Sequence, residues 1–142
     1  MAFIPFSQSW ILVASSALFL LPAAKLWHCT QYDTSAVLAA TSLVSMNYWK
    51  HAQQHTWQHT LDLYWGKLAF AYTAGTGLWF VKDRTDILLL HGPNFLVTAG
   101  LFRLSNDLYT LQPTTTHWLV CHVLFHVMLL VQMCQVAKTM CS

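Results

Sequence analysis

The chain carries little charge. Asp, Lys and Arg together make up 8% of its 142 residues, and glutamate does not occur. A typical soluble domain has about 25% charged residues, so these groups are too sparse to solvate the surface of a globular protein. The scarcity also excludes a disordered tail and a coiled coil. Hydrophobic side chains make up 56% of the chain, a composition typical of a polytopic membrane protein whose helices face lipid.

The low net charge and the cysteine spacing exclude further classes of protein. The net charge is only +2 and the seven Lys and Arg residues are scattered, so we expect no nucleic-acid partner. The four cysteines, Cys29, Cys121, Cys134 and Cys141, show no CxxC spacing, and no disulfide framework is predicted. Histidine is the exception. Eight imidazoles are many for so apolar a chain, and buried imidazoles need partners.

Five apolar segments follow one another along the chain, without the period-two alternation of strands. They lie near residues 10–27, 35–50, 62–81, 86–103 and 117–137. A helix needs about 20 residues to cross a membrane; the first, third and fifth segments meet this length, and the other two are marginal. We therefore predict one all-α transmembrane domain over residues 1–142, a bundle of about five spans, with four as the alternative. Pro93 predicts a kink or break in the fourth helix.

The first segment also resembles a signal peptide, because residues 21–24 read Leu-Pro-Ala-Ala. No Lys or Arg precedes it, so the charged n-region is missing and a span is favoured. With five spans, four basic residues fall on the side opposite the N-terminus and two on the N-terminal side. They are Lys25, Lys82, Arg84 and Lys138 against Lys50 and Arg103. By four to two, the positive-inside rule places the side opposite the N-terminus in the cytosol.

Two histidines inside the last apolar segment form an HxxxH pair. Residues four apart share one face of a helix, so His122 and His126 project side by side and can bind the same ion. Zinc is a common partner of imidazole. The alternative is that both rings merely pack in the bundle. An unpartnered imidazole pair within an apolar span is costly, however, which favours a functional role.

A third imidazole and a carboxylate are expected at the same membrane depth. On one continuous helix His51 and Asp62 would lie about 16 Å apart, too far to share a site. If the second helix ends near His51 and the third begins near Asp62, both groups lie at one face of the membrane. The fifth helix begins at that face too. His51, Asp62, His122 and His126 are therefore predicted to converge.

This constellation predicts a catalytic zinc centre. Three neutral imidazoles leave the fourth tetrahedral position of zinc open for water, and the metal lowers the pKa of that water towards about 7. Asp62 is placed to accept a proton or to orient the water. The other histidines have simpler interpretations: His55 and His59 in a polar loop between spans, His28 and His91 as interfacial or packing residues.

Two short stretches resemble the superfamily that contains the alkaline ceramidases, the progestin and adiponectin receptors, haemolysin-III-like proteins and relatives of myomaker. They are SMNYWKHA at residues 45–52, with Leu-Asp at 61–62, and CHVLFHV at residues 121–127. The resemblance implies a zinc hydrolase of that family in shortened form, five spans replacing the usual seven. It also implies a lipid amide such as ceramide as substrate, His51, His122 and His126 as ligands, and Asp62 as the residue that positions water.

One position departs from this pattern. The family's serine stands four residues before the first ligand, where this chain has Asn47, and Ser45 lies two residues earlier. Ser45 and Asn47 are therefore both candidate catalytic residues, since either can hydrogen-bond a polarised carbonyl or a water molecule.

Three functions stay open at this point. The first is a zinc-dependent intramembrane hydrolase acting on a membrane lipid. The second is a non-catalytic small transmembrane subunit or lipid-sensing component that binds partner membrane subunits, favoured by the missing pair of spans and by Asn47. The third uses histidines as axial ligands of haem or chlorophyll, to which an HxxxH pair beside a carboxylate is less suited. We expect an integral multi-pass protein of an endomembrane or the plasma membrane.

Overall fold

The protein forms an all-helical bundle. A computed structural model describes residues 4–81, 83–111 and 115–142, and this part of the chain contains helices and no strand. The elements are α1 (Phe6–Ala17), α2 (Leu20–His28), α3 (Tyr32–Lys50), α4 (Trp57–Phe80), α5 (Arg84–Asp86), the π-helical turn η1 (Ile87–His91), α6 (Gly92–Leu111) and α7 (Thr116–Met140). The prediction of an all-α bundle is therefore confirmed.

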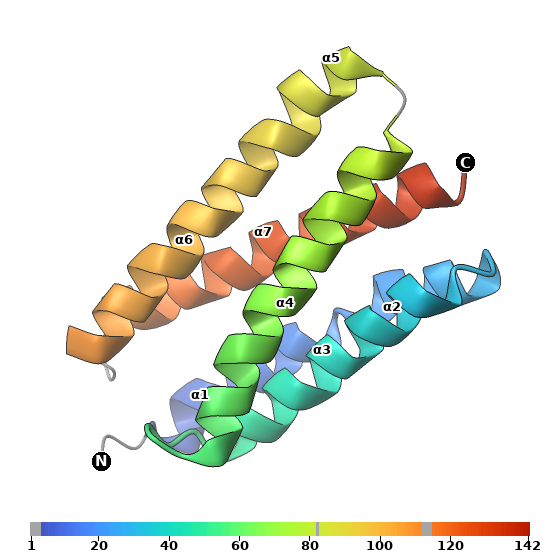
Figure 1. The fold of residues 1–142 in the computed structure, drawn as a ribbon. Helices are drawn as coiled ribbons and strands as arrows, with labels where there is room; N and C mark the ends of the chain where they lie inside the picture. Colours follow the sequence, from blue (N-terminus) through green and yellow to red (C-terminus); the bar gives the residue numbers. More distant parts are fainter. Residues whose placement is uncertain (1–3, 82, 112–114) are drawn as a thin grey trace.

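These elements form five rods, one for each predicted apolar segment. The pair α1–α2 and the series α5–η1–α6 each make one rod, while α3, α4 and α7 are rods by themselves. In Figure 1, α4 lies between α3 on one side and the α5–α6 rod on the other, with α7 behind it. The main packing partners are α1, α2 and α4 for α3, and α6, α4, α2 and α1 for α7, so α3 and α7 hold the bundle together.

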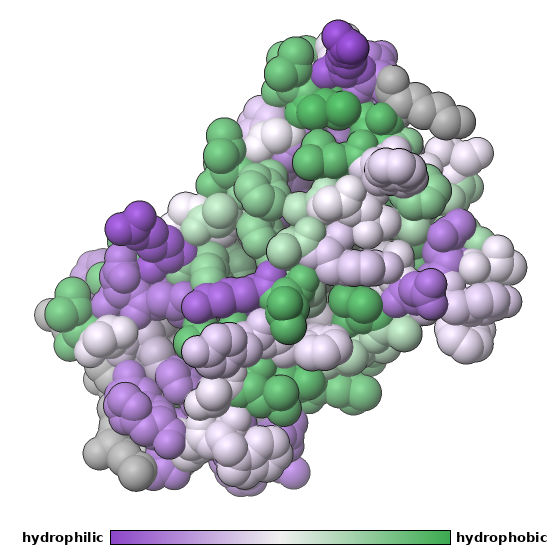
Figure 2. Space-filling view, in the orientation of Figure 1, coloured by the Kyte–Doolittle hydropathy of each residue, from purple (hydrophilic) through white to green (hydrophobic). Residues whose placement is uncertain are grey.

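Three rods are long and apolar enough to cross a membrane: Ser7–His28, Arg84–Leu111 and Thr116–Met140. The fourth segment, expected to be marginal, thus qualifies because its helix extends well beyond residues 86–103. The third segment does not, since α4 includes His59, Asp62 and Lys67. The α5–α6 rod exposes leucines as a lipid-facing helix does: Leu88, Leu89 and Leu96 are 72%, 74% and 70% exposed. Figure 2 shows apolar side chains over this part of the molecule.

The helix α3 packs through small polar residues. Its buried Ser35 donates a hydrogen bond to the carbonyl of Ala23 at 2.7 Å, and Ser42 donates to that of Ser16 at 2.8 Å. Small side chains let helices approach closely, and such interhelical bonds stabilise membrane bundles without a hydrophobic driving force. This explains how a segment of modest hydropathy packs against α1, α2 and α4.

The fourth rod changes its helical pitch where a kink was predicted. Pro93 has no backbone N–H, so an α-helical bond is missing there, and the preceding residues Ile87–His91 form the π-helical turn. Gly92 follows this turn because a Cβ there would lie 2.9 Å from the carbonyl oxygen of Ile87.

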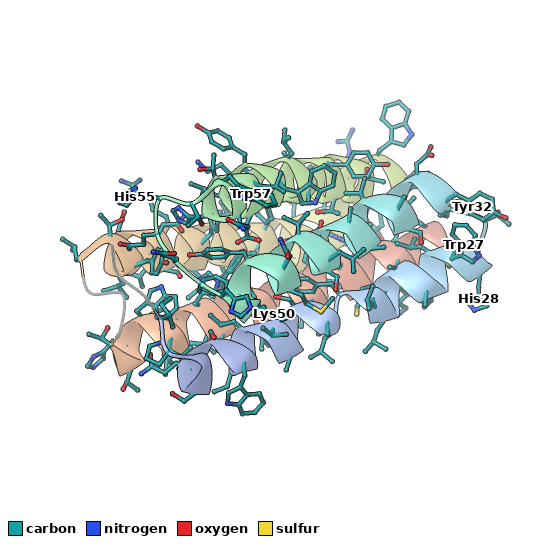
Figure 3. The ribbon with its side chains drawn as sticks, turned by 90° about the horizontal axis from the view of Figure 1, so that it is seen from below. Trp27, His28, Tyr32, Lys50, His55 and Trp57 are labelled. Atoms are coloured by element: carbon teal, nitrogen blue, oxygen red, sulfur yellow. A yellow bond between two sulfur atoms is a disulfide. The ribbon has the colours of Figure 1, made fainter. Side chains whose placement is uncertain are left out.

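A disulfide between Cys29 and Cys141 joins the end of α2 to the end of α7, with Cα atoms 5.6 Å apart. The cysteine spacing gave no indication of this pair, although both residues lie just beyond the predicted first and last spans. Figure 3 shows the two ends of the bundle: Trp27, His28 and Tyr32 near the disulfide end, and Lys50 and His55 towards the other.

Candidate functional site

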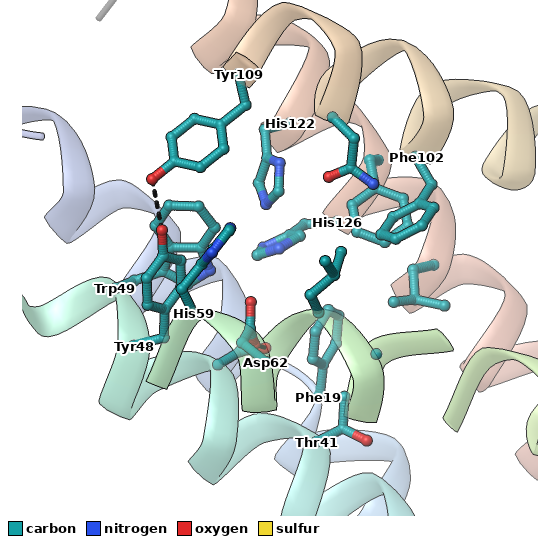
Figure 4. Close-up of a pocket in the computed structure, with 16 residues that line it drawn as sticks. Phe19, Thr41, Tyr48, Trp49, His59, Asp62, Phe102, Tyr109, His122 and His126 are labelled. Carbon is teal, nitrogen blue, oxygen red and sulfur yellow. Dashed lines mark hydrogen bonds between the residues drawn. The ribbon is translucent and has the colours of Figure 1, made fainter. Parts of the chain in front are cut away.

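A pocket of about 50 Å³ lies between α3, α4, α6 and α7, towards the end of the bundle opposite the disulfide. Its polar lining residues are Thr41, Ser45, Tyr48, Trp49, His59, Asp62, Asn106, Tyr109, His122 and His126. Figure 4 shows that these side chains come from all four helices. The structure thus brings together four of the six predicted site residues, namely Ser45, Asp62, His122 and His126.

The HxxxH pair forms one wall of the pocket. His122 and His126 are 7% and 4% exposed, and their ring centroids are 4.8 Å apart. The Nδ1 atom of His122 is hydrogen-bonded to the hydroxyl of Ser105 on α6 at 2.5 Å, and that of His126 to the hydroxyl of Ser15 on α1 at 2.7 Å. These bonds fix the orientation of both rings. In the tautomer in which Nδ1–H donates to the serine oxygen, Nε2 carries the lone pair that can bind a ligand.

Asp62 lies across the pocket from this pair. Its carboxylate projects from α4 towards the His126 imidazole (Figure 4). Ser45, buried on α3, donates a hydrogen bond to Oδ1 of Asp62 at 2.5 Å. Because this bond occupies one oxygen and fixes the carboxylate, Oδ2 is the oxygen available to a water molecule or a substrate.

Aromatic side chains close the pocket near the end of the bundle. The hydroxyls of Tyr48 and Tyr109 are hydrogen-bonded at 2.5 Å (Figure 4), and the Trp49 ring centroid lies 4.8 Å from that of His122. His59 contacts both tyrosines, at centroid distances of 5.4 Å and 5.7 Å. These rings therefore shield this end of the pocket from the aqueous phase.

His59 precedes the predicted span at residues 62–81. Partial burial, followed by the influence of His55, lowers the pKa of its imidazole. The ring is therefore neutral at neutral pH and has a lone pair available for a metal.

Two predicted residues lie outside the pocket. The helix α3 ends at Lys50, and His51, the residue that caps it, is exposed to the surroundings. Asn47 is exposed too, whereas Ser45, two residues earlier on the same helix, faces α4 and bonds Asp62. In this arrangement Ser45 is the α3 side chain that contributes to the site.

His59 was missed because residues 51–61 were interpreted as a loop. In the structure α4 begins at Trp57, after Thr56, whose hydroxyl accepts a hydrogen bond from the backbone N–H of His59. His59 and Asp62 are three residues apart and so share one face of α4. A threonine three residues before a polar helix position is an N-cap signal, and it would have placed His59 beside Asp62.

The side chains of the pocket are of the types that bind a transition metal, but only two of them are arranged to do so. Two buried imidazoles, oriented through their Nδ1 atoms by serine hydroxyls, have the arrangement that metal-binding histidines adopt. Within the described residues, however, no group of three or more His, Cys, Asp or Glu side chains is close enough to hold one ion. The zinc centre of three histidines predicted from the sequence is thus not formed by the described side chains.

No protein-family model, curated protein or solved structure matches the chain. The resemblance to the ceramidase superfamily consequently stays a prediction carried by the residues alone.

Proposed function

We propose that this protein is a multi-pass membrane hydrolase that binds zinc through His122 and His126 and cleaves the amide bond of a ceramide-like lipid. The observation that carries the proposal is the pair of buried imidazoles, each held at Nδ1 by a serine from a different helix. Bonds of this kind to the second ring nitrogen orient metal-binding histidines and increase their basicity.

The roles of the surrounding residues follow from their contacts. Zinc held by the pair would act as a Lewis acid and lower the pKa of a bound water. Asp62, fixed by Ser45, accepts the proton that the attacking water loses and returns it to the leaving amine. His59 is the nearest further imidazole on α4 and replaces His51 in the proposed ligand set.

The orientation we propose is opposite to the one favoured by the basic residues. Disulfides persist in oxidising compartments, and Cys29–Cys141 lies at the end of the bundle opposite the N-terminus. We place that end in a lumen or outside the cell, in an endomembrane or the plasma membrane. We give the disulfide more weight than the four-to-two count of basic residues. A reducing compartment such as the cytosol would break the bond, whereas a small excess of basic residues only biases the orientation.

The alternative is a non-catalytic lipid-binding component of a larger membrane complex. It is favoured by the lack of a three-donor group within the described residues, since a hydrogen-bonded polar pocket can bind a lipid headgroup without metal.

Metal analysis of the purified protein separates the two functions. We expect about one zinc per chain in the wild type, and its loss in His122→Ala. The matched control is His117→Ala, an exposed histidine on the same helix, which should retain the metal. A folded, monodisperse wild-type chain without transition metal would refute the zinc proposal.

A second variant separates catalysis from metal binding. Asp62→Asn keeps an acceptor for Ser45 but cannot take a proton, so it should retain zinc and lose hydrolysis of a fluorescent ceramide. If Asp62→Asn hydrolyses the lipid at the wild-type rate, Asp62 is not the proton acceptor.

A further inference from the structure

The residues that line the pocket differ in exposure from one helix to another. Every lining residue from α3 and α7 is buried, as is Phe19 before α2, whereas the lining residues from α4 and α6 are partly exposed, Tyr109 excepted. The partly exposed residues are His59, Asp62, Leu63, Gly66, Phe102 and Asn106. The pocket is therefore closed towards the centre of the bundle and open between α4 and α6.

This opening has a boundary at each end. Towards the disulfide end, α4 and α6 meet through the stacked rings of Phe70 and Phe95, whose centroids are 4.8 Å apart. Towards the other end, the rings of His59 and Tyr109 are in contact, with their centroids 5.7 Å apart. Between these contacts lie Leu63 and Gly66 on α4 and Phe102 on α6. We call this gap the α4–α6 window.

The window has apolar edges and spare room. Leu63 and Phe102 are hydrophobic, and a Cβ atom added at Gly66 would meet no atom within 4 Å. The part of the window towards the Phe70–Phe95 pair is therefore lined by hydrocarbon, and the polar residues His59, Asp62 and Asn106 lie towards its other end.

The pocket behind the window is small. A water molecule needs about 10–15 Å³ of such space, so the enclosed 50 Å³ holds only a few groups of that size. A polar linkage fits between Asp62 and the imidazoles, but the chains attached to it do not. They must extend outwards through the opening.

We infer that the α4–α6 window admits a hydrocarbon chain of a bilayer lipid laterally, with Gly66 as the residue that keeps it open. The inference rests on the proposed function for the chemistry in the pocket, but the passage itself depends only on the apolar edges and the missing side chain.

The test is photolabelling of the protein in phosphatidylcholine vesicles with a ceramide that carries a diazirine in its acyl chain. Gly66→Phe fills the window, and labelling should fall to the background measured with excess unlabelled ceramide. Gly66→Ala leaves most of the space and should label as the wild type does. Gly75→Phe is the matched control, because Gly75 lies nine residues further on the opposite face of α4 and its Cβ also meets no atom within 4 Å.

The outcomes distinguish this inference from the proposed function. Wild-type labelling in folded Gly66→Phe, or none in the wild type, overturns the window. If zinc is absent but Gly66→Phe still blocks labelling, the window stands and the metal proposal fails. Equal zinc content in Gly66→Phe and wild type, with labelling lost, supports both.

Discussion

Replacing Ser105 by alanine removes the hydroxyl that holds the Nδ1 atom of His122 at 2.5 Å. Both residues are buried, so no bulk water replaces the lost partner. A buried polar group left unpaired costs about 1–3 kcal/mol. Loss of such an orienting bond weakens metal binding about 10–100-fold, which corresponds to about 1.4–2.8 kcal/mol. The first figure is the expected loss of folding stability, and the second is the expected loss of zinc-binding free energy.

The assay is zinc affinity, measured by competition with a chromogenic chelator, together with thermal unfolding. The matched control is Thr98→Ala, because Thr98 is equally buried on α6 and donates its hydrogen bond to the Asn94 carbonyl of its own helix at 2.7 Å. We expect Thr98→Ala to lower stability without changing zinc affinity. The reasoning fails if Ser105→Ala binds zinc as the wild type does, or if Thr98→Ala weakens binding equally.

Two further predictions concern the ligand set and the disulfide. His59→Ala should weaken zinc binding in the same competition assay, whereas His51→Ala should not; the opposite result would restore His51 as a ligand through a rearrangement of the segment after α3. Cys141→Ser should lower the free energy of unfolding by about 2–4 kcal/mol, since the bond closes a loop of 112 residues. Reduction of the wild type should destabilise it to the same extent and so lower its melting temperature. An unchanged melting temperature on reduction would contradict the bond.

The fold follows largely from the sequence because lipid leaves the backbone few choices. A long apolar run must satisfy its own backbone hydrogen bonds, and a helix does so within one segment. Five apolar runs therefore predict five rods, and Pro93 marks the turn of altered pitch that precedes it. Local composition is sufficient for such features.

The site was only partly predictable because it depends on where helices begin and which helices touch. His122 and His126 share a face by spacing alone, so their convergence could be read from the sequence. His51 does not reach the pocket because α3 ends one residue before it. His59 was not predicted as a site residue because α4 starts at Trp57, five residues before Asp62. Ser105 and Ser15 lie far from the histidines in sequence, and only packing of α6 and α1 against α7 reveals them.

The disulfide and the pocket together determine which compartment the proposed chemistry would face. Cys141 follows His126 by fifteen residues along α7, a separation of about 22 Å, which is most of the thickness of a hydrocarbon core. On α3 and α4 the site residues likewise lie at the ends farthest from Cys29. If the disulfide end is lumenal or extracellular, as we propose, the pocket lies near the cytosolic leaflet. A lipid would then reach Asp62 through the α4–α6 window from that leaflet.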